Sequence, residues 1–218
     1  ENFVLAELNR ETWAKVLIPR MLSGHLQGRA LSMFSKMIKP KYILEIGTYT
    51  GYSAICLSEG LKKGGKLHTI DINEELKLMS SIYFKKAGIS KNIIQHVGNA
   101  LKIIPNIKDD FDLVFIDADK ENYSNYFEIV IEKIPIGGFI IADNVLWSGK
   151  VVEDVNEKDQ ETKAIKEFNN LIQTSERVEN ILMPIRDGLM ICQKICQFSK
   201  SGPTRPRLLG VGRALLLL

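Results

Sequence analysis

Short apolar runs, each followed by a glycine or an acidic residue, alternate with helical segments from about residue 40 to residue 197. The runs at 42–46, 66–70, 93–97, 111–116 and 139–142 have the length and composition of buried parallel strands. Between two of them, apolar residues from Tyr123 to Ile134 recur at the i, i+3, i+4 spacing of an amphipathic helix, as do those from Ala164 to Ile172. This alternation predicts an α/β fold with a doubly wound, mostly parallel sheet and right-handed crossovers.

The pattern changes near the end of the chain. Apolar runs at 181–185 and 189–195 flank the turn Arg186-Asp187-Gly188, which predicts an antiparallel pair at the sheet edge. We expect one domain over residues 1–198, with 1–38 as a helical segment packed on the core. Residues 199–218 lose the pattern and end in four leucines, which indicates a disordered or vector-derived tail. A membrane-binding tail is the alternative, but the stretch is short and has no long amphipathic face.

Composition narrows the classes of partner. The formal net charge is +3 and the lysines are spread along the chain, so nucleic acid is not an expected partner. A signal peptide is not visible, and no apolar run reaches the roughly 20 residues that span a bilayer. Cys56, Cys192 and Cys196 are odd in number and lack metal-ligand spacing, which is typical of buried free thiols. We therefore expect a cytoplasmic protein without a membrane partner.

The ends of the predicted strands define one neighbourhood. In open α/β sheets, ligands bind beyond the carboxyl ends of the strands. Five residues lie at the carboxyl ends of the five predicted strands, although they are distant in sequence. They are Gly47, Asp71, Gly98, Asp117 and Asp143. The active site is expected at this edge.

The first strand leads into the segment EIGTYTGYS at 45–53. Gly47 allows a sharp turn and a close approach to a ligand. The G-x-x-x-G spacing matches neither the dinucleotide nor the phosphate-loop fingerprint. Glu45 would repel phosphate but attract an ammonium group, and Asp71 is placed to accept hydrogen bonds from ribose hydroxyls.

A cofactor with a ribose, an ammonium group and no phosphate is S-adenosylmethionine. Gly98-Asn99-Ala100 would then border its adenine. The alternative is that the glycine turn is purely structural.

Acidic residues follow the next two strands. Asp117, Asp119, Asp143 and the amide Asn144 would be brought together, and the acids would repel one another without a cation between them. Oxygen donors without a nearby His or Cys favour a hard ion such as Mg²⁺, Ca²⁺ or Mn²⁺ over zinc. Solvated loop carboxylates are the alternative.

Lys120 lies three residues after Asp117, where its side chain could enter the same pocket. A nearby metal charge would favour the neutral amine, which makes Lys120 a candidate general base. An exposed lysine in a salt bridge is the alternative.

With these residues assembled, the chain resembles the cation-dependent O-methyltransferases of the caffeoyl-CoA and catechol type, and more closely the bacterial members. The resemblance covers about residues 10–197. It is carried by MLSGHLQG at 21–28, EIGTYTGYS at 45–53, DADKENY at 117–123, DNVLWSG at 143–149 and MPIRDG at 183–188. It implies the Rossmann-like class I methyltransferase fold, with a seven-stranded sheet, and a homodimer.

The resemblance also implies a role for each matching residue. The metal ligands would be Asp117, Asp143 and Asn144, with Lys120 near the reacting hydroxyl. Trp147 and Ser148 would border the acceptor, whereas His25 receives no role. The cofactor would be contacted by Met21, Ser23, Glu45, Gly47, Thr48, Ser53, Asp71, Ala100, Asp117 and Asp119.

The predicted reaction is metal-dependent methyl transfer to a hydroxyl of an aromatic vicinal diol such as a catechol, caffeate or a caffeoyl-type acceptor. CoA esters are less expected, because residues 151–160 (VVEDVNEKDQ) are short and acidic. Two other functions remain open on the same fold. One is an NAD-dependent oxidoreductase, which the missing G-x-G-x-x-G disfavours. The other is a non-catalytic cofactor-binding protein, which the presence of Asp117, Lys120, Asp143 and Asn144 disfavours.

Overall fold

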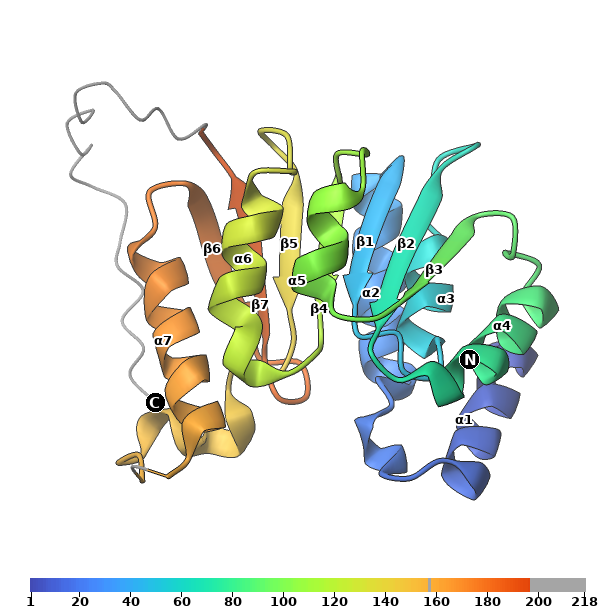
Figure 1. Cartoon of the computed structure of the whole chain (residues 1–218), viewed down its shortest axis with the longest axis horizontal. Helices are drawn as coiled ribbons and strands as arrows, with labels where there is room; N and C mark the ends of the chain where they lie inside the picture. Colours follow the sequence, from blue (N-terminus) through green and yellow to red (C-terminus); the bar gives the residue numbers. More distant parts are fainter. Residues whose placement is uncertain (157, 197–218) are drawn as a thin grey trace.

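The fold is built on one mixed sheet, which a computed structural model describes for residues 1–156 and 158–196. Seven strands lie in the order β3-β2-β1-β4-β5-β7-β6 (Figure 1). Their bounds are β1 Tyr42–Ile46, β2 Lys66–Asp71, β3 Ile93–Val97, β4 Leu113–Ile116, β5 Phe139–Ala142, β6 Val178–Met183 and β7 Leu189–Lys194. Strands β1 to β5 pair in parallel, and β7 is antiparallel to both of its neighbours, β5 and β6. The predicted doubly wound sheet with an antiparallel pair at one edge is confirmed.

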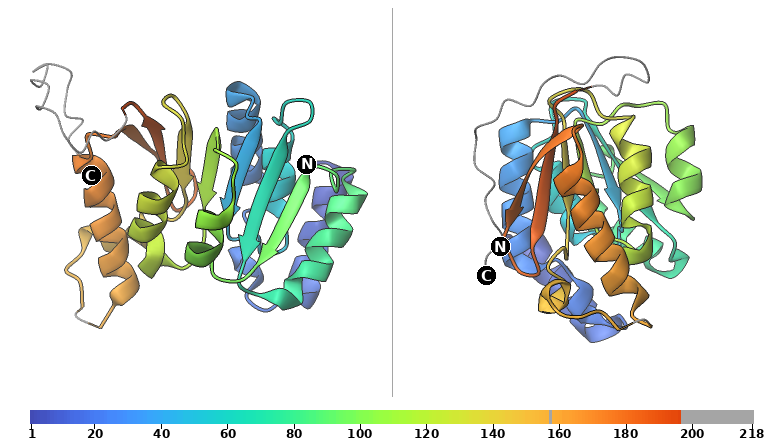
Figure 2. Two further views of the ribbon diagram at one scale, coloured as in Figure 1. Left: turned by 45° about the horizontal axis from the view of Figure 1, so that its top comes forward. Right: turned by 90° about the vertical axis from the view of Figure 1, so that its left-hand side faces the viewer.

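Helices cover both faces of the sheet (Figure 2). The first four helices pack on one face and the last three on the other, so the central strands β1, β4 and β5 are buried from both sides and are mostly apolar, whereas β3 at the edge is partly exposed. The helices are α1 Phe3–Lys15, α2 Gly24–Ile38, α3 Tyr52–Ser58, α4 Lys77–Lys86, α5 Ala100–Ile103, α6 Tyr123–Ile131 and α7 Gln160–Thr174. Short 3-10 turns are η1 Pro19–Met21, η2 Glu74–Leu76, η3 Ile104–Asn106, η4 Lys120–Asn122 and η5 Trp147–Val152.

Two of the predicted elements end earlier than expected, each before a proline. The apolar pattern from Tyr123 continues to Ile134, but helix α6 ends at Ile131 because Pro135 disfavours helical geometry at the preceding residue. Ile134 remains buried in the core beyond the helix end. Strand β6 ends at Met183, directly before Pro184, and begins at Val178, earlier than the apolar run predicts. The positions of the elements are those expected, and their boundaries shift by a few residues.

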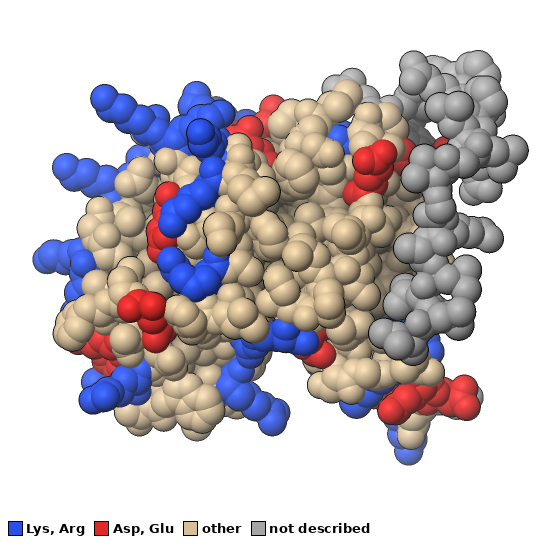
Figure 3. All heavy atoms as spheres, turned by 180° about the vertical axis from the view of Figure 1, so that it is seen from behind, with Lys and Arg blue, Asp and Glu red and all other residues tan. Residues whose placement is uncertain are grey.

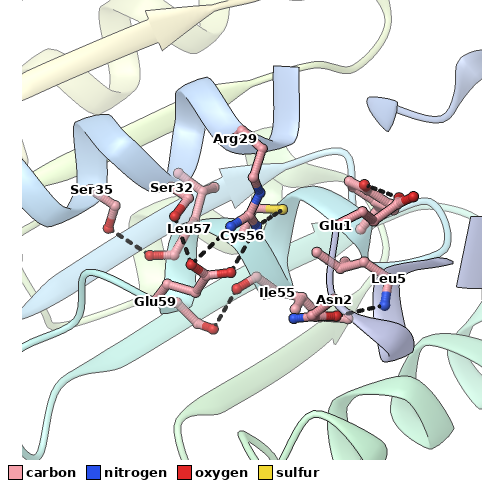
Figure 4. Close-up of polar contacts among 12 residues, drawn as sticks. Glu1, Asn2, Leu5, Arg29, Ser32, Ser35, Ile55, Cys56, Leu57 and Glu59 are labelled. Carbon is pink, nitrogen blue, oxygen red and sulfur yellow. Dashed lines mark hydrogen bonds and ion pairs between the residues drawn. The ribbon is translucent and has the colours of Figure 1, made fainter. Parts of the chain in front are cut away.

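A cluster of polar side chains fastens α2 to α3 (Figure 4). The guanidinium of Arg29 donates to both carboxylate oxygens of Glu59, at 3.1 and 2.7 Å, and to Cys56 Sγ at 3.2 Å. Ser32 and Lys36, further along α2, each donate to Glu59 at 2.7 Å. Because these contacts converge on Glu59, the C-cap of α3, they hold α2 against the end of α3.

Helix α2 also presents apolar side chains to solvent. Leu26, Met33 and Met37 are exposed on this helix. In the view from behind, lysine and arginine gather to one side, and the centre has few charged residues (Figure 3). The homodimer expected from the resemblance stays a prediction. No helix in the described part of the chain has the length and hydropathy to cross a bilayer. The predicted tail at 199–218 lies outside the described residues.

Candidate active site at the carboxyl ends of the strands

The sheet brings the predicted residues to one edge. Glu45 lies in β1 and Asp71 ends β2, while Asp117 and Asp143 directly follow β4 and β5. The backbone N–H of Asp117 donates to Ile46 O at 2.9 Å, so the loops remain in register with the strands beside them. Residues separated by nearly 100 positions in the sequence therefore share one site.

The backbone geometry at position 47 requires glycine. Its φ is +105°, a conformation that glycine tolerates better than other residues. A Cβ at this position would lie 1.9 Å from the carbonyl oxygen of Asp117. The close approach predicted for this glycine is therefore made to the chain itself, where the β1–α3 loop contacts the end of β4.

The glycine loop and the N-terminal segment line a hollow above β1. The segment before α2 forms one wall, and the first turn of α3 and the end of β4 form the others. Six residues predicted to contact a cofactor line it, and these are Met21, Ser23, Gly47, Thr48, Ser53 and Asp117. The structure therefore brings most of the predicted cofactor residues around one opening.

Asp71 lines an adjoining hollow together with Thr48 and Tyr49, at the end of β2. One of its oxygens accepts a hydrogen bond from the Tyr49 N–H at 2.6 Å, and the other accepts from the Asn73 N–H at 2.8 Å. Each carboxylate oxygen has a second lone pair that these bonds do not use. The carboxylate is thus held in place and still able to accept hydrogen bonds from a ligand.

Glu45 is a buried carboxyl group with an unused oxygen. It is 0% exposed, and its Oε2 accepts a hydrogen bond from Thr69 Oγ1 at 2.5 Å. Its Oε1 is buried and has no hydrogen-bond partner among the described residues. Burial, reinforced by the charges of Asp117 and Asp71, raises the pKa of Glu45 to about 8. A buried acceptor without a donor is costly, and a bound cationic donor would remove that cost.

Lys120 occupies the centre of the acidic group. Its ammonium is 2.8 Å from Asn144 Oδ1, 3.2 Å from Asp117 Oδ1 and 2.6 Å from the hydroxyl of Tyr123. The side chain is buried and lies 5.8 Å from the ring centroid of Trp147. Lys120 is therefore a buried cation that contacts two of the three predicted metal ligands.

Asp143 is the most buried of the predicted metal ligands, at 3% exposure. Its two oxygens accept hydrogen bonds from Gln27 Nε2 and from the Asn144 N–H, both at 2.7 Å. Burial, together with the nearby charge of Asp117, raises the pKa of Asp143 well above its usual range. The two carboxylates therefore lie close enough to repel each other, and a cation between them would relieve that repulsion.

The loop after β5 is conformationally strained. Asn144, Trp147 and Ser148 all have positive φ, of 59°, 47° and 55°. The Ser148 N–H donates to Asp187 Oδ1 at 2.6 Å, and the indole N–H of Trp147 is buried without a partner among the described residues. Strained backbone of this kind is characteristic of binding and catalytic loops.

Three predicted cofactor residues line neither hollow, and these are the fully buried Glu45 together with Asp119 and Ala100. Asp119 accepts hydrogen bonds from the Tyr126 hydroxyl and from the Asn122 side chain, so it is engaged with α6 and the turn before it. Ala100 is buried at the start of α5 and packs in the core. Their roles toward a cofactor stay predictions.

The structure adds three residues that sequence reasoning missed. Gln27 contacts Asp143, and the Tyr123 hydroxyl accepts from Lys120 and donates to the Asp143 carbonyl oxygen at 3.0 Å. Arg186 donates to the backbone of Leu22 and Ser23. All three lie in the motifs that carried the resemblance, and the only available signal was their presence there.

The metal-ligand set depends on an amide. Among the described residues, no three His, Cys, Asp or Glu side chains are grouped to hold a metal ion. The predicted set has two carboxylates, and Asn144 supplies its third oxygen.

The sheet order, the reversed seventh strand and the acidic and glycine loops at the carboxyl edge define the Rossmann-like methyltransferase class. The sequence model of the O-methyltransferase family matches residues 1–195. The chain belongs to this family, as its resemblance predicted, and is an O-methyltransferase.

Known relatives agree with this assignment. Caffeoyl-CoA O-methyltransferase of Medicago sativa is 34% identical over 206 residues, which cover 89% of this chain and 83% of the relative. The crystal structure of a Bacillus cereus O-methyltransferase in complex with SAH matches with a TM-score of 0.83 at 30% identity, covering 89% of this chain and 91% of that one. TomG from Streptomyces achromogenes, involved in tomaymycin synthesis and solved with SAM, matches with a TM-score of 0.82 at 26% identity, covering 90% and 91%.

Proposed function

We propose that the protein transfers a methyl group from S-adenosylmethionine to a hydroxyl of an aromatic vicinal diol, such as a catechol, caffeate or a caffeoyl-type acceptor, with a divalent cation in the site. The observation that carries this proposal is the position of Asp117. It lines the hollow formed by the glycine loop and also contacts Lys120 in the acidic group. One carboxylate thus joins the proposed cofactor site to the proposed reaction site.

S-adenosylmethionine fits the hollow by its chemistry. The free Oε1 of Glu45 is an acceptor for an ammonium group, and Asp71 retains lone pairs for ribose hydroxyls. The solved relative from Bacillus cereus contains SAH, the product that this cofactor leaves after methyl transfer. Bound here, the cofactor would supply an electrophilic methyl group on sulfur.

A hard divalent cation fits the donor set of Asp117, Asp143 and Asn144. These side chains offer carboxylate and amide oxygens, and the mutual repulsion of the two acids favours a cation between them. Mg²⁺ is the first choice, with Ca²⁺ or Mn²⁺ as alternatives. Bound there, the metal would acidify a hydroxyl of the acceptor.

The chain itself provides the base and its supports. In its neutral amine form, Lys120 would accept at Nζ the proton that the acceptor hydroxyl releases, and it would become the ammonium ion. Asn144 Oδ1 and the Tyr123 hydroxyl then hold the ammonium, as they do in the structure. Burial raises the pKa of Tyr123 far above its usual value, so its hydroxyl keeps its proton. Trp147 covers Lys120 and would shield the reacting groups from water.

The direct test is methylation of catechol and caffeate with S-adenosylmethionine and Mg²⁺, with the product identified by mass spectrometry. We expect one methyl group on one hydroxyl, loss of activity in EDTA and recovery with added Mg²⁺. The Asp117→Ala variant should be inactive. Full activity in EDTA would contradict the metal, and an absence of methylation with any diol would contradict the acceptor class.

The oxidoreductase alternative is separated by binding. Titration calorimetry should show binding of S-adenosylhomocysteine and none of NAD. The reverse result would overturn the proposed cofactor.

A further inference from the structure

Arg186 joins two segments at opposite ends of the sequence. It lies in the turn between β6 and β7, with a φ of +53°. One guanidinium nitrogen donates to Leu22 O at 3.0 Å, to Ser23 O and to Gln27 Oε1 at 3.3 Å. Leu22 and Ser23 line the proposed cofactor hollow. A single cation therefore anchors the segment that forms one wall of that hollow.

Gln27 connects Arg186 to the proposed metal site. It is 1% exposed in helix α2, and its Nε2 donates to Asp143 Oδ2 at 2.7 Å. The other oxygen of Asp143 accepts from the Asn144 N–H. Because both oxygens are engaged, the plane of the Asp143 carboxylate is fixed.

The charges at its two ends determine which way the Gln27 amide faces. A guanidinium only donates hydrogen bonds, and an ionised carboxylate only accepts them. The amide oxygen must therefore face Arg186 and the amide nitrogen must face Asp143. Turning the amide over would place oxygen against carboxylate and nitrogen against guanidinium. Arg186 thus selects the Gln27 orientation that donates to Asp143.

The same turn also supports the loop after β5. Gly188 O accepts from the Val145 N–H at 3.2 Å, and Asp187 O accepts from the Leu146 N–H at 2.9 Å. Helix α2 is also held by contacts from Arg29 and Ser32 to Glu59 (Figure 4), and Lys36 donates to the same carboxylate. Gln27 therefore projects from a helix that also has supports outside the site.

We propose that Arg186 and Gln27 form a positioning relay, in which Arg186 orients Gln27 and Gln27 holds the Asp143 carboxylate in the orientation that binds the metal. The relay also anchors Leu22 and Ser23 at the cofactor. The inference rests on the proposed function, since it assigns these residues to the same site. Neither residue contacts the reacting atoms in this scheme.

The test uses Gln27→Met and Arg186→Met in the full chain, because methionine has the length of glutamine, replaces the aliphatic part of arginine and removes the hydrogen bonds of both. Mn²⁺ binding is measured by electron paramagnetic resonance, and S-adenosylhomocysteine binding by calorimetry. Gln27→Met should weaken Mn²⁺ binding by about tenfold to a hundredfold, as removal of a residue supporting a ligand does. It should change S-adenosylhomocysteine binding by less than about threefold, as expected for a side chain outside the hollow.

Arg186→Met should weaken the binding of both ligands. In the double variant, the Mn²⁺ loss should not exceed that of Gln27→Met, since the two residues act through one contact. Arg186→Lys should rescue only part of the loss, because lysine cannot reproduce the guanidinium geometry.

Lys36→Met is the matched control. It lies on the same helix and loses a 2.7 Å contact to Glu59, which is outside the site, so neither ligand should bind differently. An unchanged Mn²⁺ affinity in Gln27→Met, or additive losses in the double variant, would overturn the relay.

A crystal structure of Gln27→Met separates this inference from the proposed function. If wild-type protein binds no Mn²⁺, the metal part of the proposed function fails. The position of Asp143 then decides the relay. Rotation of its carboxylate away from the wild-type position supports the relay, and an unchanged carboxylate overturns it.

Discussion

The carboxyl edge of the sheet has two halves, one beside β1 and β2 and one beside β4 and β5. The acidic residues of the two halves have different hydrogen-bond partners. Beside β1 and β2, Glu45 accepts from a threonine hydroxyl and Asp71 from backbone N–H groups, and no hydrogen bond or salt bridge to a cation is found for either among the described residues. Beside β4 and β5, Asp117 and Asn144 contact the buried ammonium of Lys120. In the described part of the chain, no cation is bonded to the acids of the first half, although Lys77 lines the same hollow as Asp71, whereas Asp117 in the second half is bonded to Lys120.

This difference matches the ligands that we propose for each half. An acid held only by neutral donors is available to a cationic ligand, such as the ammonium group of a cofactor. An acid already paired with lysine can exchange that partner for a second cation, a bound metal ion. The arrangement predicts that removing the internal cation affects chemistry, whereas removing the unpaired acid affects binding.

The largest expected effect is that of Lys120→Met. Loss of the general base should lower kcat about a thousandfold, within the range for proton transfer by a positioned side chain. S-adenosylhomocysteine binding should remain within about threefold of wild type, because Lys120 does not line the hollow. Stopped assays with catechol and calorimetry measure the two quantities. Equal losses in kcat and in cofactor binding would remove the distinction between the halves.

The next effect concerns Glu45 and the pH dependence of stability. Its folded pKa of about 8 lies above the ordinary value of 4.5, so the folded state binds the proton more tightly than the unfolded state. The folded protein should therefore lose stability as pH rises from 4.5 to 8, by on the order of 5 kcal/mol. Glu45→Gln should remove much of this loss.

The same variant should weaken S-adenosylhomocysteine binding about tenfold, a loss of about 1.4 kcal/mol, by removing the acceptor for its ammonium group. Urea unfolding at pH 5 and pH 8.5, with and without this ligand, tests both expectations. The Asp143→Asn variant is measured in the same way, because the pKa of Asp143 is raised as well and this group could contribute to the same pH dependence. If the stability of Glu45→Gln depends on pH as strongly as that of wild type, Glu45 is not the group responsible.

A third carboxylate gives the opposite pH dependence. Burial raises the pKa of Glu59, but hydrogen bonds from Arg29, Lys36 and Ser32 outweigh it and lower the pKa to about 2. Its stabilising contribution is present above pH 4.5 and is lost as the pH falls toward 2, by on the order of 2 kcal/mol. Unfolding of Glu59→Gln should vary less than wild type over this range. If the free energy of unfolding changes equally with pH in Glu59→Gln and in wild type, Glu59 is not the source of this pH dependence.

The smallest expected effect is that of Asp187→Ala. Loss of the 2.6 Å hydrogen bond to the Ser148 N–H should loosen the acceptor loop and raise the acceptor KM about fivefold, equivalent to roughly 1 kcal/mol. Cofactor binding should not change, since Asp187 supports only the half beside β5. Steady-state kinetics with varied catechol provide the measurement. A change confined to the cofactor KM would show that the turn supports the other half instead.

The sequence predicts the components of the site better than their contacts. Strand ends could be located because buried parallel strands are apolar and stop at glycine or acidic residues. This placed Glu45, Asp71, Asp117 and Asp143 at one edge correctly. The short spacing from Asp117 to Lys120 also allowed their contact to be anticipated.

The long-range contacts could not be predicted in this way. Gln27 and Asp143 are 116 positions apart, and Arg186 lies 163 positions from Ser23. No periodicity links such pairs, because their contact depends on how α2 and the β6–β7 turn pack against the sheet. The pattern placed Tyr123 on the apolar face of a helix, and it did not reveal that its hydroxyl also holds Lys120.

The close packing of Gly47 on the Asp117 carbonyl has a consequence for protein engineering. Position 47 has no space for any side chain, whichever acceptor is used. In a library selected for new acceptors, substitutions at Trp147 or Ser148 should shift which compounds are methylated. Substitutions at Gly47 should instead abolish activity on all of them alike. Position 47 therefore supplies an internal reference by which altered selectivity can be distinguished from a damaged scaffold.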